Sequence, residues 1–194
     1  MVNITLTKSK TALLIADFYS DMMSSIPHAV NRDVVKKTVA LQQAARRSGL
    51  LICYSATVFR EGYPEISDRN KTFSQRKASG QPAVSDPLQV IHPEVQPIAG
   101  EIVAGKHRVN ALFGTDLDMT LKANDIETIL ILGYATSGVV LSTTRYAADL
   151  DYRILIVEDC CSDQDIEVHD FLMTRIFPRQ ADIVQSEELI KSLA

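Results

Sequence analysis

Apolar residues along this chain fall into short runs that are separated by stretches with helical spacing. Each run is too short for a typical globular helix and is bounded by turn signals, which favours a strand buried on both faces. The runs occupy residues 11–16, 50–58, 101–105, 126–132, 153–157 and 182–184. Together they predict a parallel sheet of about six strands.

The stretches between the runs carry apolar residues at helical spacing and begin near side chains that cap helices. Between Asn31 and Gly49, apolar residues recur on one helical face. Further helices are predicted after Asp116, after a cap at Thr136 or Ser137, between Ser162 and Pro178, and from Ser186. Strands that alternate with helices predict an α/β fold, a three-layer α/β/α sandwich, with residues 1–194 as one domain.

The segment from about residue 60 to residue 100 follows neither pattern. Glycine and proline punctuate it, and no helical or strand period persists. So long a connection in a compact domain is usually functional or a partner surface. We interpret it as a lid that brings positive charge to an anionic small molecule; a solvated surface loop is the alternative. Its cationic, aromatic and amide side chains are Arg60, Tyr63, Arg69, Asn70, Lys71, Phe73, Arg76 and Lys77.

The composition narrows the classes of function. The 194 residues carry a formal net charge of −4 with both signs interspersed, so neither a basic face for nucleic acid nor a polybasic membrane tract is predicted. The N-terminal apolar run is too short to span a membrane and lacks a secretory cleavage pattern. We therefore expect a cytoplasmic protein.

Cysteine and histidine do not show the spacing of a metal site. Three cysteines, two of them adjacent, favour reduced thiols over a disulfide framework or zinc. The histidines fall in predicted loops or helices and are expected at the surface: His28, His92, His107 and His169. We predict no metal and no cofactor. Since no G-x-G-x-x-G follows any strand, a flavodoxin-like or dinucleotide-binding protein is not favoured.

Ionisable residues follow two of the predicted strands directly. Asp17 comes after the first strand and Lys106 after the third, while residues 133–138 form a turn between a strand and a helix. Strand ends at the switch points of open α/β sheets are where ligands bind. A carboxylate there can move a proton, an ammonium group can hold the carboxylate or a substrate anion, and turn amides can stabilise an oxyanion.

Three motifs, in this order, resemble those of the isochorismatase-like hydrolases, the superfamily of nicotinamidases, ureidoacrylate amidohydrolases and isochorismatases. They are LLIADFYSDM, GKHRVNALFGTDLD and GYATSGVVLSTTRYAADLDYRILIVEDCCSD. The resemblance implies that Asp17 and Lys106 take the two catalytic positions. It also implies a sheet order of 3-2-1-4-5-6, a peptide bond at Tyr134–Ala135 that is often cis, and a homo-oligomer.

The chain departs from the family pattern at the nucleophile. When Gly133 and Thr136 are placed on the family's Gly-x-x-Thr-x-x-Cys-Val motif, Val139 stands where the cysteine belongs. Isochorismatases of the phenazine type have glycine there and hydrolyse a vinyl ether with the aspartate as general acid. The family's metal motif, Asp-x-His after the second strand, is missing, because residues 55–58 read SATV.

Two hypotheses about function remain open. The first is a hydrolase of a small anionic substrate that works through Asp17 and Lys106 without a covalent cysteine step. The second is a catalytically silent member that serves as a small-molecule binder or oligomeric scaffold. For the first, the turn amides at Ala135 and Val139 are candidates for an oxyanion hole, and the candidate substrate contacts are Phe18, Arg60, Arg108 and Tyr134.

Overall fold

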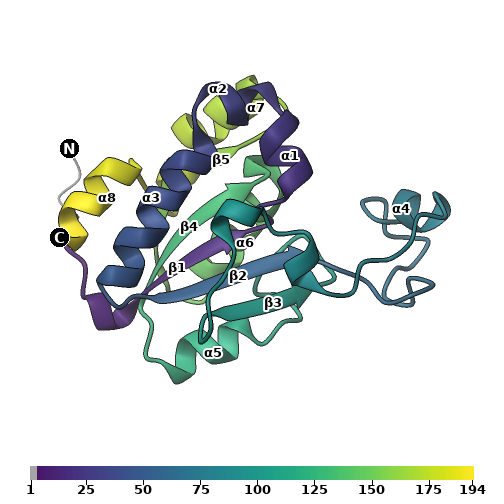
Figure 1. Ribbon diagram of the computed structural model, residues 1–194, viewed down its shortest axis with the longest axis horizontal. Coiled ribbons are helices and arrows are strands. Elements are labelled where there is room, and N and C mark those ends of the chain that lie inside the picture. Colours follow the sequence, from purple (N-terminus) through teal and green to yellow (C-terminus); the bar gives the residue numbers. More distant parts are fainter. Residues whose placement is uncertain (1–3) are drawn as a thin grey trace.

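A computed structural model describes residues 4–194 as a six-stranded parallel sheet with helices on both faces (Figure 1). The strand order is β3-β2-β1-β4-β5-β6, so the predicted fold class and order are confirmed. The strands are β1 (Thr11–Ala16), β2 (Leu51–Thr57), β3 (Ile102–Lys106), β4 (Thr128–Tyr134), β5 (Arg153–Ser162) and β6 (Asp182–Val184). Every residue of β1 is buried, which is why its sequence shows a continuous apolar run and no alternation.

The described residues 4–194 contain eight α-helices. They are α1 (Ser20–Ser25), α2 (Pro27–Asn31), α3 (Val34–Arg47), α4 (Ser74–Ala78), α5 (Leu117–Ala123), α6 (Leu141–Asp149), α7 (Ile166–Phe171) and α8 (Ser186–Leu193). Helices α3 and α8 lie side by side on one face of the sheet, and α6 lies on the other (Figure 1). Single π-helical turns follow β4 at Thr136–Val140 and α7 at Leu172–Ile176.

The beginning of α3 differs from the prediction. Asn31 ends a separate short helix that starts at Pro27, and α3 begins only at Val34. Proline with its fixed φ favours the first turn of a helix, and Asp33 adopts φ 53°, a left-handed conformation that separates the two helices. The stretch before Pro27 forms α1, a helix that the sequence pattern does not predict.

Strand β5 is five residues longer than predicted, ending at Ser162 and not at Val157. Glu158 and Asp159 interrupt the apolar run, so the sequence pattern ends too early. In the fold both carboxylates find partners on other elements: Glu158 bonds to Arg32, and Asp159 accepts hydrogen bonds from Ser186. Paired carboxylates are compatible with a buried strand.

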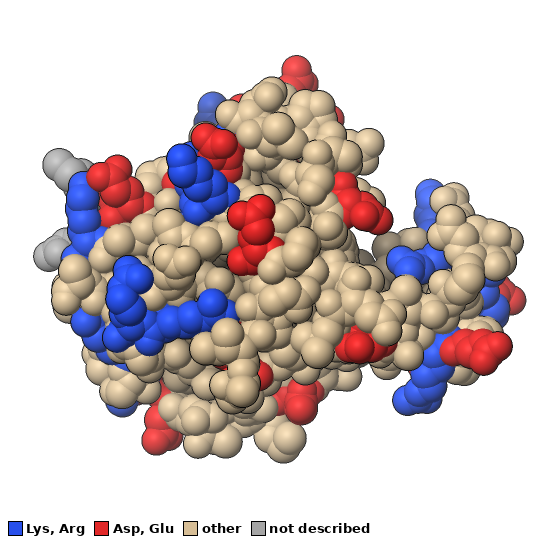
Figure 2. All heavy atoms as spheres, viewed as in Figure 1, with Lys and Arg blue, Asp and Glu red and all other residues tan. Residues whose placement is uncertain are grey.

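Residues 59–83, which we call the arm, project from the body of the molecule (Figure 1). The arm has a small apolar cluster of its own, formed by Phe59, Tyr63 and Ile66 with Phe73 and Ala83 packed against it. It carries α4, a helix that the sequence pattern did not predict. Lys and Arg side chains gather on its surface (Figure 2). No helix within residues 4–194 has the length and apolar character needed to cross a membrane.

Candidate active site

Asp17 and Lys106 meet at the carboxyl edge of the sheet, as the two strand-end positions predict. Asp17 follows β1, and Lys106 is the last residue of β3. Lys106 Nζ lies 2.6 Å from Asp17 Oδ2 and donates to Thr57 Oγ1 at 2.7 Å and to the carbonyl of Arg108 at 3.0 Å. An ammonium group has three protons, so these three acceptors account for all of them. Lys106 is therefore placed to hold Asp17.

Burial dominates the electrostatics of this pair. The side chain of Lys106 is 1% exposed and that of Asp17 is 9% exposed. Burial raises the pKa of Asp17, against the opposing effects of the Lys106 ammonium group and the Tyr19 hydroxyl. Burial likewise lowers the pKa of Lys106, although Asp17 opposes this. Oδ1 of Asp17 is buried without a hydrogen-bond partner among residues 4–194, so it is the oxygen that is available to hold or deliver a proton.

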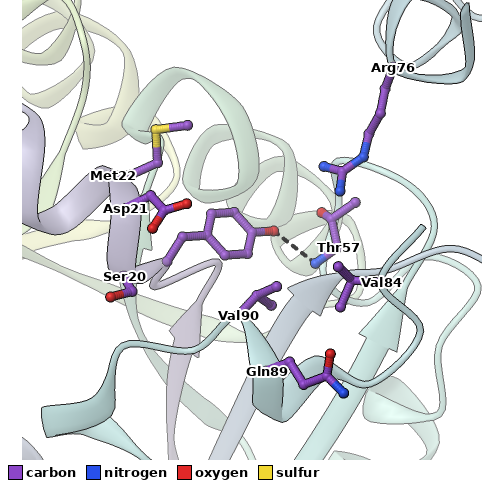
Figure 3. A pocket seen from close by; sticks show the side chains of 9 residues that line it. Ser20, Asp21, Met22, Thr57, Arg76, Val84, Gln89 and Val90 are labelled. Atoms are coloured by element: carbon purple, nitrogen blue, oxygen red, sulfur yellow. Dashed lines mark hydrogen bonds between the residues drawn. The ribbon is translucent and has the colours of Figure 1, made fainter. Parts of the chain in front are cut away.

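A cavity of about 300 Å³ lies between α1 and the arm (Figure 3), and its lining residues include neither Asp17 nor Lys106. Tyr19 and Thr57 form part of its wall, and the Thr57 amide donates to the Tyr19 hydroxyl at 2.8 Å. Thr57 also accepts a hydrogen bond from Lys106, so Thr57 connects this wall of the cavity to the Asp17–Lys106 pair. The remaining lining residues are Ser20, Asp21, Met22, Arg76, Val84, Gln89 and Val90. The volume suits a small organic molecule.

Arg76 supplies a positive charge to this cavity. It reaches from α4 toward Thr57 (Figure 3), and its guanidinium carbon lies 5.8 Å from the centre of the Phe59 ring. Its Nε is buried and has no hydrogen-bond partner within the described residues. Sequence reasoning placed Arg76 in a basic segment but did not single it out, because only the fold of the arm turns it toward the cavity.

The turn after β4 contains the cis peptide bond at Tyr134–Ala135 that the family resemblance implied. Its capping differs from the prediction, because no side chain of Thr136 or Ser137 caps the helix. Instead, Asp163 Oδ2 accepts the Ser137 amide at 2.7 Å. The amides of Gly138 and Val140 donate to the carbonyl of Ala135. The assignment of the Ala135 and Val139 amides as oxyanion donors stays a prediction, and the Val139 side chain is buried.

The structure places the four candidate substrate contacts in different environments. Phe18 is 1% exposed, and its ring meets the edge of His92, so it belongs to the core. Arg60 is exposed and pairs with Glu65 at 3.4 Å. Arg108 meets the pair through its backbone, while its side chain lines a second cavity beside Glu65, His107, Phe113 and Gly114. Tyr134 is partly buried at the start of the turn.

None of the three cysteines is free to react. Cys53, Cys160 and Cys161 are all buried and unpaired. Burial raises the pKa of both Cys53 and Cys160 to about 12, and it raises the pKa of Cys161 as well. A thiol reacts as its thiolate, so these side chains are inert at neutral pH.

The histidines were expected at the surface, but three of the four are buried. His28 is 8%, His92 6% and His169 0% exposed. For His28 and His169 the prediction failed because groups on distant elements reach their ring nitrogens: the Asp163 amide lies 3.3 Å from His28 Nδ1, and Thr136 Oγ1 lies 2.8 Å from His169 Nδ1. Among residues 4–194, no group of three or more His, Cys, Asp or Glu side chains could hold a metal ion.

We expect the cluster of His28, Arg32, Glu158 and His169 to make the free energy of unfolding depend on pH. Burial opposes ionisation of Glu158, but hydrogen bonds from His169 and Gln185 and the charge of Arg32 lower its pKa to about 2. Burial, then the charges of His169 and Arg32, lower the pKa of His28. Both pKa values lie below those of the unfolded chain, so both groups stabilise the fold above their unfolded pKa values and lose that contribution as pH falls.

Urea unfolding between pH 7 and pH 3 tests this expectation. Glu158→Gln should lower the free energy of unfolding by roughly 2–3 kcal/mol at pH 7 and by progressively less toward acid pH. Glu187→Gln is the matched control, because Glu187 forms an exposed ion pair with Lys191 and should contribute little at any pH. A wild-type minus Glu158→Gln difference that stays constant across this range would contradict the assignment.

Comparison with known proteins agrees with this geometry. Residues 11–188 match the family model described as the isochorismatase domain. An uncharacterized isochorismatase family protein of Bacillus subtilis, YwoC, is 29% identical over 95% of this chain and 94% of its own length. Maleamate amidohydrolase of Pseudomonas putida is 25% identical over 82% of this chain and 74% of its own. The structure of an isochorismatase family protein from Burkholderia thailandensis is 26% identical, covers 97% of both chains and superposes with a TM-score of 0.81.

Proposed function

The chain belongs to the isochorismatase family, and on that premise we propose that it hydrolyses a small anionic organic molecule through Asp17 and Lys106 without a covalent cysteine step. The observation that carries the proposal is the buried pair itself. Burying a carboxylate together with an ammonium group has a large desolvation cost, and here Lys106 pairs with Asp17 Oδ2 while Asp17 Oδ1 has no hydrogen-bond partner within the described residues.

Asp17 acts as a general acid in this mechanism. Burial raises the pKa of Asp17, which favours its protonated form, and in that form it donates a proton to the substrate as the scissile bond polarises. Water then adds to the electron-poor carbon, the bond from that carbon to the leaving group breaks, and the leaving group departs with the proton that Asp17 supplied. The Asp17 carboxylate takes one proton from the added water. One water molecule is consumed, and Asp17 returns to its starting state. Lys106 keeps the carboxylate in place throughout.

The absence of a covalent step rests on position 139 and on the thiols. Val139 occupies the place of the nucleophilic cysteine when Gly133 and Thr136 are matched to the family motif. Valine cannot attack a substrate, and the three cysteines of the chain are buried with raised pKa values. A direct attack by water needs no thiol.

The anionic character of the substrate is supported by Arg76. A guanidinium group binds carboxylates well, and Arg76 faces the cavity with an unpartnered Nε. This residue takes the role that the sequence analysis gave to Arg60 and Arg108. Maleamate amidohydrolase is among the relatives, so carboxamides that carry an acid group belong in any substrate screen beside vinyl ethers.

A catalytically silent binder or scaffold is the second candidate. The near-complete burial of the Asp17–Lys106 pair favours a catalytically silent protein, since the Lys106 side chain is only 1% exposed. In either case we propose a cytoplasmic homo-oligomer. The arm supports an oligomer, because it projects from the body and offers a surface to a second copy of the chain (Figure 1).

The first test is a substrate screen run with and without a thiol reagent. We expect hydrolysis of at least one vinyl ether or small carboxamide that carries a carboxylate, and weaker turnover of its methyl ester, which cannot pair with Arg76. Iodoacetamide should leave that activity within about twofold, because buried thiols with raised pKa values react slowly. Stoichiometric inactivation that substrate prevents would overturn the noncovalent mechanism.

A further inference from the structure

A line of three polar side chains runs beneath the turn on the side away from Asp17. Thr136 Oγ1 lies 2.8 Å from His169 Nδ1, and His169 Nε2 lies 3.0 Å from Glu158 Oε1. The three residues come from the turn, from α7 and from β5. Neither Thr136 nor His169 has any exposed surface, so the hydrogen bond between them is made in the interior, where a lost partner is costly.

Several groups surround the His169 ring. Thr136 Oγ1 donates its single proton to the carbonyl of Ser162 at 3.1 Å, so toward His169 Nδ1 the hydroxyl oxygen can act as an acceptor. On the other side of the ring, Arg32 Nη1 lies 3.3 Å and Glu158 Oε1 lies 3.0 Å from His169 Nε2. The ring is thereby held between Thr136 on one side and Arg32 and Glu158 on the other.

The order of groups is hydroxyl, imidazole and carboxylate, which is the order of a hydrolytic triad. Thr136 is nevertheless no nucleophile, since it is fully buried. Its hydroxyl lies toward β5, 3.1 Å from the carbonyl of Ser162, whereas Asp17 follows β1 on the other side of β4. The line consequently acts on the turn and not on a substrate.

We propose that His169 is a positioning residue that fixes the turn, by holding Thr136, so that Ala135 and Val139 face the Asp17–Lys106 pair. Asp163 supplies the second attachment through the Ser137 amide at 2.7 Å. The two attachments hold consecutive residues of the turn from the β5 side. The effect on the turn stands independently, and only its consequence for catalysis rests on the proposed function.

Two substitutions of His169 separate positioning from simple packing. Asn can place a polar atom where Nδ1 stands and so keep the contact with Thr136, whereas Gln can reach Glu158 but leaves Thr136 without its partner. The readout is amide hydrogen exchange at Ser137 and Gly138, measured relative to the amides of β4. We expect exchange within about threefold of wild type in His169→Asn, and at least about tenfold faster in His169→Gln.

Thr136 offers the same test from the other end of the bond, should either His169 variant fail to fold. Thr136→Val removes the hydroxyl and should speed exchange of both amides as His169→Gln does. Thr136→Ser keeps the hydroxyl and should restore slow exchange. Equal exchange in Thr136→Val and Thr136→Ser, or in the two His169 variants, would overturn the proposal.

Turnover links the inference to the proposed function. On any substrate found in the screen, His169→Gln should lower kcat by about tenfold with little change in KM, while His169→Asn retains most of kcat. Faster exchange with unchanged kcat would uphold the positioning of the turn and count against its role in catalysis. Exchange needs no substrate, so a protein that is inactive throughout the screen still decides whether His169 fixes the turn.

Discussion

Asp17→Asn is expected to lower the rate of hydrolysis by at least about a hundredfold, the lower end of what a general acid contributes. The amide is nearly isosteric with the carboxyl group but has no acidic proton to donate to a substrate. The fold should stay intact, because Asn can still accept a hydrogen bond from Lys106. Substrate binding should also persist, since Arg76 is unchanged.

The same variant separates an enzyme from a scaffold. If Asp17 served only as the partner of Lys106, its loss would leave a buried ammonium group without a counter-charge and cost roughly 3–5 kcal/mol of stability, with no rate to lose. One thermal melt and one rate measurement therefore suffice. Asp149→Asn, at an exposed position on α6, is the control and should change neither quantity. A full rate in a folded Asp17→Asn protein would exclude Asp17 as the general acid.

Gly133→Ala should abolish stable folding, with an expected loss of more than about 4 kcal/mol, in the range reserved for severe steric or backbone defects. A Cβ at this position would lie 1.8 Å from the carbonyl oxygen of Ala16 and 2.8 Å from its carbonyl carbon. Both contacts are with backbone of the central strand β1, which cannot move aside. Gly133 also has φ 142°, a conformation that L-residues rarely adopt.

Gly138→Ala in the same turn is the matched control. Its added Cβ would meet no atom closer than 3.7 Å, the Cβ of Ala135, and Gly138 has no positive φ. Alanine in a helical turn is favoured over glycine by up to about 1 kcal/mol, so this variant should be as stable as wild type or slightly more so. Soluble expression and urea unfolding compare the two. A Gly133→Ala protein that unfolds with the wild-type midpoint would mean that β1 and β4 can separate at little cost.

Much of the sheet was predictable because a strand that is buried on both faces appears in the sequence as a short, nearly continuous run of apolar residues. Residues 12–16 are apolar throughout and follow Thr11, so both the existence and the bounds of β1 followed from the pattern. Charged residues directly after such runs must lie at the carboxyl edge, and parallel strands share that edge. The positions of Asp17 and Lys106 at the same edge of the sheet therefore followed from the strand that precedes each residue, once the strands were assigned.

Other features depended on partners that are distant in sequence. The full length of β5 and the burial of His169 were hidden, because polar residues are compatible with a buried position only when another element satisfies them, here Arg32 and Thr136. The orientation of Arg76 depended on how the arm folds back toward α1. A sequence pattern records whether a residue is apolar, but the pairing of hydrogen-bonding groups between elements is decided only when the chain is packed, which is why the tertiary structure alone revealed the network beneath the turn.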